Sequence, residues 1–237
     1  MSNAAVAVIG GSGQVARALE RRAAHHGISL AARGRPGLDI NDMQSVATFL
    51  YEAQPRVVVN AAAYTAVDKA EGEPDAAFRA NAEGPARLAV LCHAAGVPLI
   101  HISTDYVFDG TKPDAYVETD PIAPLSVYGA SKAAGEDAVR SAAARHAILR
   151  TSWVYDTEGA NFLTTMLRLA AEREEVRVVA DQVGAPTAAG ELADAILSVA
   201  NALLREGGEE LSGTYHVAGG GVTTWHGFAS EIFRLAA

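Results

Sequence analysis

The sequence predicts an α/β fold in which helices cover both faces of a parallel sheet. Short apolar runs alternate along the chain with longer amphipathic runs, and this alternation is typical of a doubly wound parallel sheet. A glycine-rich turn, Gly10 to Gly13, directly follows the first apolar run and precedes a helical pattern. Hydrophobic residues make up 49% of the 237 residues, which is enough for a substantial core. We therefore predict a Rossmann-like sheet.

The first part of the chain is regular. Its strands are short apolar runs, and its helices carry apolar residues every three or four positions. In chain order we expect a strand at 5–9, a helix at 14–26, a strand at 28–32, a helix at 43–53, a strand at 57–60, a helix at 76–95 ended by Gly96, a strand at 98–103, a helix at 128–144 and a strand at 147–150.

The second part is less regular and predicts a smaller, partly irregular C-terminal lobe. We expect helices at 162–172 and 190–205, and short strands at 176–180 and 214–217. Thr223 and Thr224 stand where a hydroxyl would cap a last helix at 225–235.

Charge and cysteine content exclude several classes of protein. The net charge of −9 argues against binding to nucleic acid or to an anionic membrane. The single cysteine, Cys92, forms no intramolecular disulfide and fits a reducing cytoplasm. It lies in an apolar helical stretch, so we expect a buried structural role rather than a catalytic thiol. We see no signal peptide, no membrane span and no metal-ligand spacing, since His25 and His26 are adjacent.

The glycine turn predicts a dinucleotide site. Gly10 permits the tight turn, Gly13 permits close approach to a diphosphate, and Ala16 permits close packing of helix on sheet. The helix that follows presents free N–H groups and a partial positive charge. A purely structural turn is the alternative. Arg33 and Arg35 follow the second strand, where NAD-binding proteins usually carry a carboxylate. They favour NADPH, unless they belong to a solvated loop.

A tyrosine and a lysine stand four residues apart at a predicted helix start. Tyr128 and Lys132 therefore share one helix face. An ammonium beside a phenol lowers the pKa of the phenol, so Tyr128 is a candidate general acid for a ketone that is reduced by hydride. Ser103 and Thr104 end a strand and offer hydroxyls to the substrate oxygen. The alternative is a pair on a solvated helix face.

Four longer stretches carry a specific resemblance. They are NAAAYTAVDKAE at 60–71, STDYVFDG at 103–110, RTSWVY at 150–155 and DQVGAPT at 181–187. Together they resemble the dTDP-4-dehydrorhamnose reductase family, within the extended short-chain dehydrogenase/reductase superfamily. The resemblance covers essentially the whole chain.

The resemblance implies roles for individual residues. Tyr128 would be the proton donor, Lys132 its partner and a ligand of the nicotinamide ribose, and Thr104 the Ser/Thr member of the catalytic triad. The implied cofactor-binding residues are Gly10, Gly13, Gln14 and Val15 at the diphosphate, Asp39 and Ile40 at the adenine, and Ala63, Tyr64 and Thr65 near the nicotinamide, with Tyr128 and Lys132. The implied substrate-binding residues are Thr104, Asp105 and Trp153.

Three of these roles have structural alternatives. Trp153 follows a strand directly and has the amphipathic ring that stacks on sugars, but it also suits a core. Asp105 suits a turn cap, and Asp39 suits an N-cap-like loop position.

The implied activity is NAD(P)H-dependent reduction of the C4 ketone of a nucleotide-linked 6-deoxyhexose. The implied reaction converts dTDP-4-dehydro-L-rhamnose to dTDP-L-rhamnose, with NADPH as the cofactor and NADH also considered. A ketoreductase for another dTDP-deoxysugar and a non-catalytic, NAD(P)-binding regulatory subunit are the alternatives. The intact set of Thr104, Tyr128 and Lys132 argues against the regulatory subunit.

The resemblance also divides the chain. We expect residues 1–150 to bind NAD(P) and residues 151–237 to form mainly the substrate-binding lobe, with an approximate boundary and strands that interleave. Family members extend some tens of residues beyond the point that corresponds to Ala237. The partner is then a nucleotide sugar, neither nucleic acid nor membrane, and a homodimer is left open.

Overall fold

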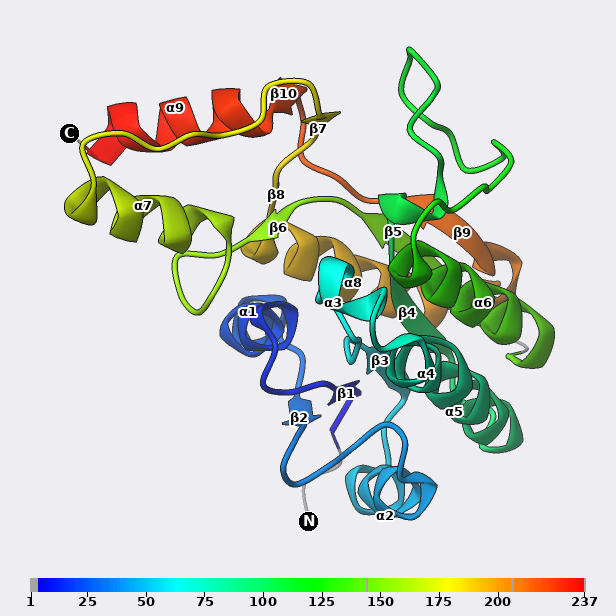
Figure 1. The fold of residues 1–237 in the computed structure, drawn as a ribbon. Coiled ribbons are helices and arrows are strands. Elements are labelled where there is room, and N and C mark those ends of the chain that lie inside the picture. Colours follow the sequence, from blue (N-terminus) through cyan, green and yellow to red (C-terminus); the bar gives the residue numbers. More distant parts are fainter. Residues whose placement is uncertain (1–3, 144, 206, 237) are drawn as a thin grey trace.

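The computed structural model describes residues 4–143, 145–205 and 207–236, so the predicted helix end at Ala144 lies outside the described residues. A six-stranded sheet forms its centre (Figure 1). Every neighbouring pair in it is parallel, so the predicted parallel sheet is confirmed. In spatial order its strands are β2 (Leu30–Arg33), β1 (Val6–Ile9), β3 (Val57–Asn60), β4 (Leu99–Thr104), β5 (His146–Thr151) and β9 (Gly213–His216).

Helices cover both faces of this sheet, as predicted. Val6 and Val8 of β1 pack on the face that holds α1 (Gln14–Ala23) and α8 (Ala189–Leu203). Ala7 and Ile9 point the other way, because successive side chains of a strand alternate. That second face is covered by α2 (Met43–Ala53), α5 (Gly84–Ala94) and α6 (Val127–Ala142). Burial on both faces explains why the strands are continuous apolar runs.

Local capping signals set several helix ends. The Asp42 carboxylate accepts hydrogen bonds from the backbone at the start of α2, and the Ser126 hydroxyl does so for α6. Asn161 and Thr164 form a capping box at the start of α7 (Phe162–Glu172). The predicted helices 43–53 and 162–172 are therefore confirmed to the residue.

The predicted helix 76–95 is continuous in direction but irregular in winding. It consists of α4 (Pro74–Phe78), a π-helical turn η2 (Arg79–Glu83) and α5. Short helical turns that we did not predict are α3 (Val67–Ala70), η3 (Asp105–Val107) and η4 (Gly208–Leu211); η1 (Ala24–His26) continues α1.

The C-terminal lobe is built on α7 and α9 (Trp225–Ala236), which lie side by side away from the sheet (Figure 1). The Thr224 hydroxyl accepts a 3.0 Å hydrogen bond from the backbone of Gly227, so the predicted cap is confirmed. The predicted strand 176–180 is wrong: the segment is irregular, and Val176 and Val178 instead pack against Met166 and its neighbours.

Two pairs of two-residue strands connect the lobe to the sheet. We did not predict β6 (Val154–Tyr155), which pairs with β8 (Thr187–Ala188), or β7 (Val183–Gly184), which pairs with β10 (Thr223–Thr224). The chain then returns to the main sheet, where α8 packs against α1 and β9 pairs with β5. Within the described ranges, no helix is long and apolar enough to cross a lipid bilayer.

Candidate active site

The candidate residues gather at the carboxyl edge of the sheet. Gly10 follows β1, Ala61 follows β3, and Thr104 and Thr151 end β4 and β5. Strand order reverses at β1, because β2 lies on one side of it and β3 on the other. In open parallel sheets ligands bind beyond the strand ends at such a reversal. The fold therefore supplies one continuous edge for a cofactor and a substrate.

The glycine turn fits a dinucleotide diphosphate. Gly10 has φ +101°, and a Cβ on it would lie 2.6 Å from the backbone nitrogen of Ala62, so only glycine suits this position. Gly13 is the N-cap of α1, and no side chain caps that helix. The N–H groups of its first turn are thus left for an anion. Within the described chain, the buried Oε1 atom of Gln14 has no hydrogen-bond partner, while its Nε2 donates to the carbonyl of Val154 at 3.0 Å.

The residues expected at the adenine differ in exposure. Asp39 is half-buried, and its carboxylate accepts from the backbone of Asn41 at 2.9 Å. It is a turn residue rather than the N-cap of α2, which is Asp42. Ile40 is buried within the core on the α2 face. Contact of either residue with an adenine stays a prediction.

The two arginines predicted to meet a 2′-phosphate are exposed. The Arg33 guanidinium lies 2.8 Å from the Glu52 carboxylate and 4.9 Å from the centre of the Phe49 ring. A phosphate at this place would therefore compete with Glu52 for Arg33.

Tyr128, Lys132 and Thr104 come together as predicted. Tyr128 and Lys132 lie on α6 and are buried, which excludes the alternative of a solvated helix face. The Lys132 ammonium donates a 2.7 Å hydrogen bond to the carbonyl of Ile102, on β4. The Thr104 hydroxyl faces the Tyr128 phenol and acts to lower its pKa. It also donates to the Asp105 carboxylate at 3.0 Å.

One expectation about Tyr128 is wrong. We expected Lys132 to lower its pKa, but burial raises the pKa of Tyr128 to about 12, and the Thr104 hydroxyl only partly offsets this. Burial also lowers the pKa of Lys132 to about 8, because the charged form loses its hydration. At neutral pH the phenol therefore holds its proton firmly and the ammonium stays charged.

Besides Thr104, the two residues expected at the substrate occupy different settings. Asp105 is the first residue of η3, and burial raises the pKa of its carboxyl group. Trp153 is half-buried with φ +46°. Its ring stacks on that of Trp225, with centroids 3.6 Å apart and an interplanar angle of 12°. These contacts agree with the structural alternatives, in which Asp105 is a turn residue and Trp153 is a packed ring. Contact of either residue with a sugar stays a prediction.

The segment expected near the nicotinamide follows β3. Ala63 and Tyr64 are half-buried and Thr65 is exposed. The Tyr64 hydroxyl donates to the Glu73 carboxylate at 2.8 Å. Tyr64 and Val67 pack in one apolar cluster with Tyr128. The segment thus lies against Tyr128, and its contact with a nicotinamide stays a prediction.

Asn81, which the sequence analysis did not single out, lies beside the candidate site and bonds the segment at Tyr64. It is fully buried in the π-helical turn η2. Its side chain accepts from the Tyr64 backbone nitrogen at 2.8 Å and donates to the Tyr64 carbonyl at 3.0 Å and to the Ser131 hydroxyl at 2.9 Å. A Cβ on Gly135 would collide with the Asn81 carbonyl. The signal available in the sequence was a polar side chain on the apolar stripe of the predicted helix 76–95.

The sequence analysis also missed a pair near Lys132, Asn60 and His101. His101 is fully buried, and its Nδ1 lies 3.0 Å from the Asn60 side-chain nitrogen. Burial first, and then the charge of Lys132, lower the pKa of His101 well below its usual value, so the ring is neutral. Among the described residues, no group of three or more His, Cys, Asp and Glu side chains is arranged to hold a metal ion.

Cys92 packs in a different apolar cluster from Tyr128. It is buried in the core with Leu88 and Ala89 on α5, and burial raises its pKa to about 12. The predicted structural role of Cys92 is confirmed.

Comparison with known proteins places the chain. The family model described as RmlD substrate binding domain matches residues 4–237. The dTDP-4-dehydrorhamnose reductase of Sinorhizobium fredii is 46% identical over 230 residues, which span 97% of this chain and 77% of that protein. The Salmonella typhimurium reductase is 43% identical over 234 residues, 98% of this chain and 78% of that protein. The crystal structure of the Bacillus anthracis reductase in complex with NADP has a TM-score of 0.92 and 39% identity, covering 99% of this chain and 81% of that one. The chain therefore belongs to the dTDP-4-dehydrorhamnose reductase family.

Proposed function

We propose that this protein uses NADPH to reduce the C4 ketone of dTDP-4-dehydro-L-rhamnose, giving dTDP-L-rhamnose. The observation that carries the proposal is the buried set of Thr104, Tyr128 and Lys132 at the sheet edge that also holds the Gly10 turn. This set stands in a chain that belongs to the dTDP-4-dehydrorhamnose reductase family.

The cofactor would lie along the sheet edge. Gly10, Gly13, Gln14 and Val15 would hold the diphosphate through the backbone at the start of α1, where no side chain competes for the N–H groups. Ala63, Tyr64 and Thr65 would line the nicotinamide side, and Asp39 with Ile40 the adenine side. When bound, NADPH supplies the hydride for reduction.

The chain's own residues manage the proton and the orientation. Tyr128 is protonated at neutral pH, so its phenol donates the proton that the reduced oxygen needs. Lys132 is charged and fixed to the carbonyl of Ile102, so its ammonium stabilises the phenolate that remains. Thr104 faces the same phenol and would orient it toward the ketone.

The substrate side rests on Asp105, Trp153 and the lobe around α7 and α9. Residues 1–150 would bind the cofactor and residues 151–237 would mainly bind the sugar nucleotide. We place the protein in the cytoplasm, in line with its single, buried cysteine. A homodimer stays a prediction that sedimentation velocity would test.

The test is turnover of purified dTDP-4-dehydro-L-rhamnose, followed by loss of NADPH absorbance and by NMR of the product. NADH is run in parallel, and other dTDP-4-keto sugars give the specificity. The proposal expects dTDP-L-rhamnose as the product and a large loss of rate in Tyr128→Phe. Normal NADPH binding without turnover of any of these sugars would overturn it.

A further inference from the structure

Three side chains on one stripe of α6 contact three consecutive residues of β4. Tyr128, Lys132 and Glu136 are spaced four residues apart, so they share a helix face. The Tyr128 phenol faces the Thr104 hydroxyl, and Lys132 donates to the Ile102 carbonyl at 2.7 Å. Glu136 accepts a 2.6 Å hydrogen bond from the hydroxyl of the residue between them, Ser103. Glu136 therefore continues the catalytic stripe by one step.

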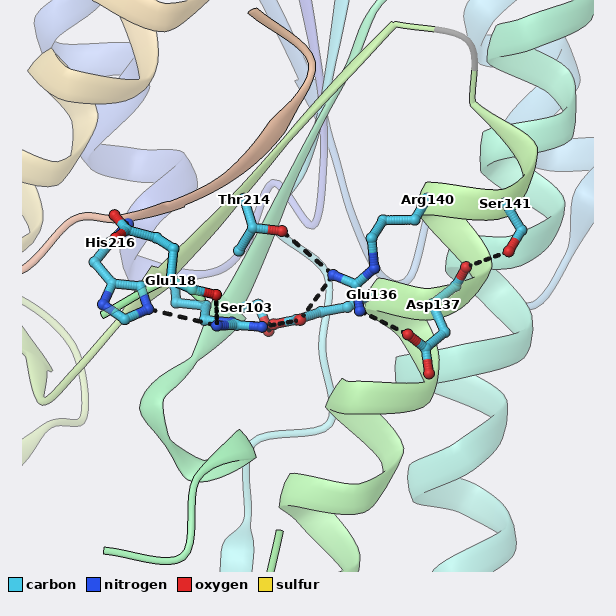
Figure 2. Close-up of polar contacts among 9 residues, drawn as sticks. Ser103, Glu118, Glu136, Asp137, Arg140, Ser141, Thr214 and His216 are labelled. Atoms are coloured by element: carbon cyan, nitrogen blue, oxygen red, sulfur yellow. Dashed lines mark hydrogen bonds and ion pairs between the residues drawn. The ribbon is translucent and has the colours of Figure 1, made fainter. Parts of the chain in front are cut away.

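The Glu136 carboxylate is fully buried and fully bonded. Oε1 also accepts from Arg150 Nε at 2.9 Å, and Oε2 accepts from Arg150 at 2.8 Å and from Arg140 at 3.2 Å. Figure 2 shows Glu136 between Ser103 and Arg140. Arg150 comes from β5 and is 5% exposed. The paired contact with Arg150 ties α6 to β5, and the bond with Ser103 ties it to β4.

Stability alone is a weak reason for this arrangement. Two charges removed from water lose their hydration, and a buried ion pair often stabilises a fold no more than apolar residues of similar volume. A single hydrogen-bonded pair does, however, fix position, because each oxygen has one defined set of donors. The pair thus has a geometric effect on α6 that an apolar contact would not give.

We propose that Glu136 is a positioning residue for the reduction: its carboxylate, held by Arg150 and Ser103, fixes the Tyr128–Lys132 stripe on β4 and places a negative charge near the Lys132 ammonium. This rests on the proposed function for its catalytic consequence only. The geometric and electrostatic effects on Lys132 are properties of the chain itself.

The groups that face Lys132 support this effect. Burial lowers the pKa of Lys132, and Glu136 is the charged neighbour that raises it. On β4, His101 is neutral and adds no charge. On α6, Tyr128 is neutral below its pKa of about 12. The charged group that β5 brings to this region is Arg150, whose guanidinium is paired with Glu136. Asp105 lies beyond these groups, beside Tyr128 and Thr104.

Lysine NMR tests the proposal without any turnover. The chain holds three lysines, Lys69, Lys112 and Lys132, so protein labelled with ¹³C-lysine gives three Cε signals, which Lys69→Arg and Lys112→Arg assign. We expect Glu136→Gln to lower the pKa of Lys132 by about one to two units. The pH dependence of kcat/KM for sugar reduction should move with it, with a loss of about two- to tenfold near neutral pH.

Leu197→Ala is the matched control. Leu197 is fully buried in α8 on the opposite face of the sheet, so its truncation destabilises the protein without touching the stripe. It should leave the Lys132 pKa unchanged. An unchanged Lys132 pKa in Glu136→Gln would overturn the proposal.

A second variant covers a failure of Glu136→Gln to fold, since that change leaves Arg150 buried without its partner. Glu136→Met with Arg150→Met removes both charges, and the Lys132 pKa should again fall; no change would overturn the proposal. A shifted pKa in a protein that reduces none of the sugars would instead overturn the proposed function and leave this inference standing.

Discussion

Gly10→Ala is the change that most directly tests the glycine turn. Gly10 has φ +101°, a region that costs an L-residue about 1–2 kcal/mol. The added Cβ would also lie 2.6 Å from the Ala62 nitrogen and 2.7 Å from the Ala61 carbonyl carbon. These are backbone atoms of the segment after β3, so relief requires β1 and β3 to shift. Overpacking of this kind costs about 1–3 kcal/mol more. We therefore expect the free energy of unfolding to fall by about 2–5 kcal/mol in total.

Gly96→Ala separates the two contributions. Gly96 has φ +66°, but nothing lies within 4 Å of the position of its Cβ. The free energy of unfolding of Gly96→Ala should therefore fall only by the cost of the backbone conformation, about 1–2 kcal/mol. Urea unfolding gives both losses, and fluorescence titration gives the affinity for NADPH.

We expect NADPH affinity to fall at least about tenfold in Gly10→Ala, because the turn must open to relieve the clash, and to stay unchanged in Gly96→Ala. Equal stability losses in the two variants would refute the steric argument. Undiminished NADPH binding by a folded Gly10→Ala protein would refute the placement of the diphosphate.

Three further outcomes are expected. Tyr128→Phe should bind NADPH normally and lose about 10²–10⁴ in turnover, the usual effect of a positioned acid; a rate within tenfold of the parent would remove Tyr128 from the mechanism. Arg33→Ala with Arg35→Ala should weaken NADPH more than NADH in calorimetric titrations, since a 2′-phosphate needs a cation; equal losses would show that these arginines do not meet it. The pKa of Lys132 is about 8 in the fold and 10.5 in the unfolded chain, so the unfolded state holds more protons between these values and stability should rise with pH there. Between about pH 7.5 and about pH 9.5, urea unfolding should show the parent gaining about 2 kcal/mol relative to Lys132→Met, at about 1.4 kcal/mol per pKa unit; a constant difference would contradict the buried lysine.

Local patterns predicted the elements whose ends are fixed locally. The helix 43–53 and the strand 57–60 are confirmed to the residue, the helix because Asp42 caps its first turn. The two-residue strands β6, β7, β8 and β10 escaped prediction because pairing with distant segments defines them. The strand predicted at 176–180 failed for the converse reason, since Val176 and Val178 pack on the apolar surface of α7 and α9 without a partner strand.

The site shows the same division between local and distant information. The spacing of Tyr128 and Lys132 is readable in the sequence, and their common face is confirmed. The pKa of Tyr128 was mispredicted because burial depends on how η3 and β4 close over α6, which no local pattern specifies. Glu136 stands at a readable interval, but its partner Arg150 becomes visible only when β5 lies beside β4.

The positions of α8 and β9 in the chain decide when the sheet can be completed during synthesis. Strands β1 to β5 and the helices α2, α5 and α6 emerge before residue 152, so their face of the sheet can close early. The opposite face is covered only by α1 until Leu192, Ile196 and Leu197 of α8 follow, and the edge of β5 stays unpaired until β9 is released. A nascent chain in this interval exposes an apolar face and a free strand edge, the surfaces through which folding intermediates aggregate. We therefore expect residues 1–150, the part predicted to bind the cofactor, not to fold independently of α8 and β9.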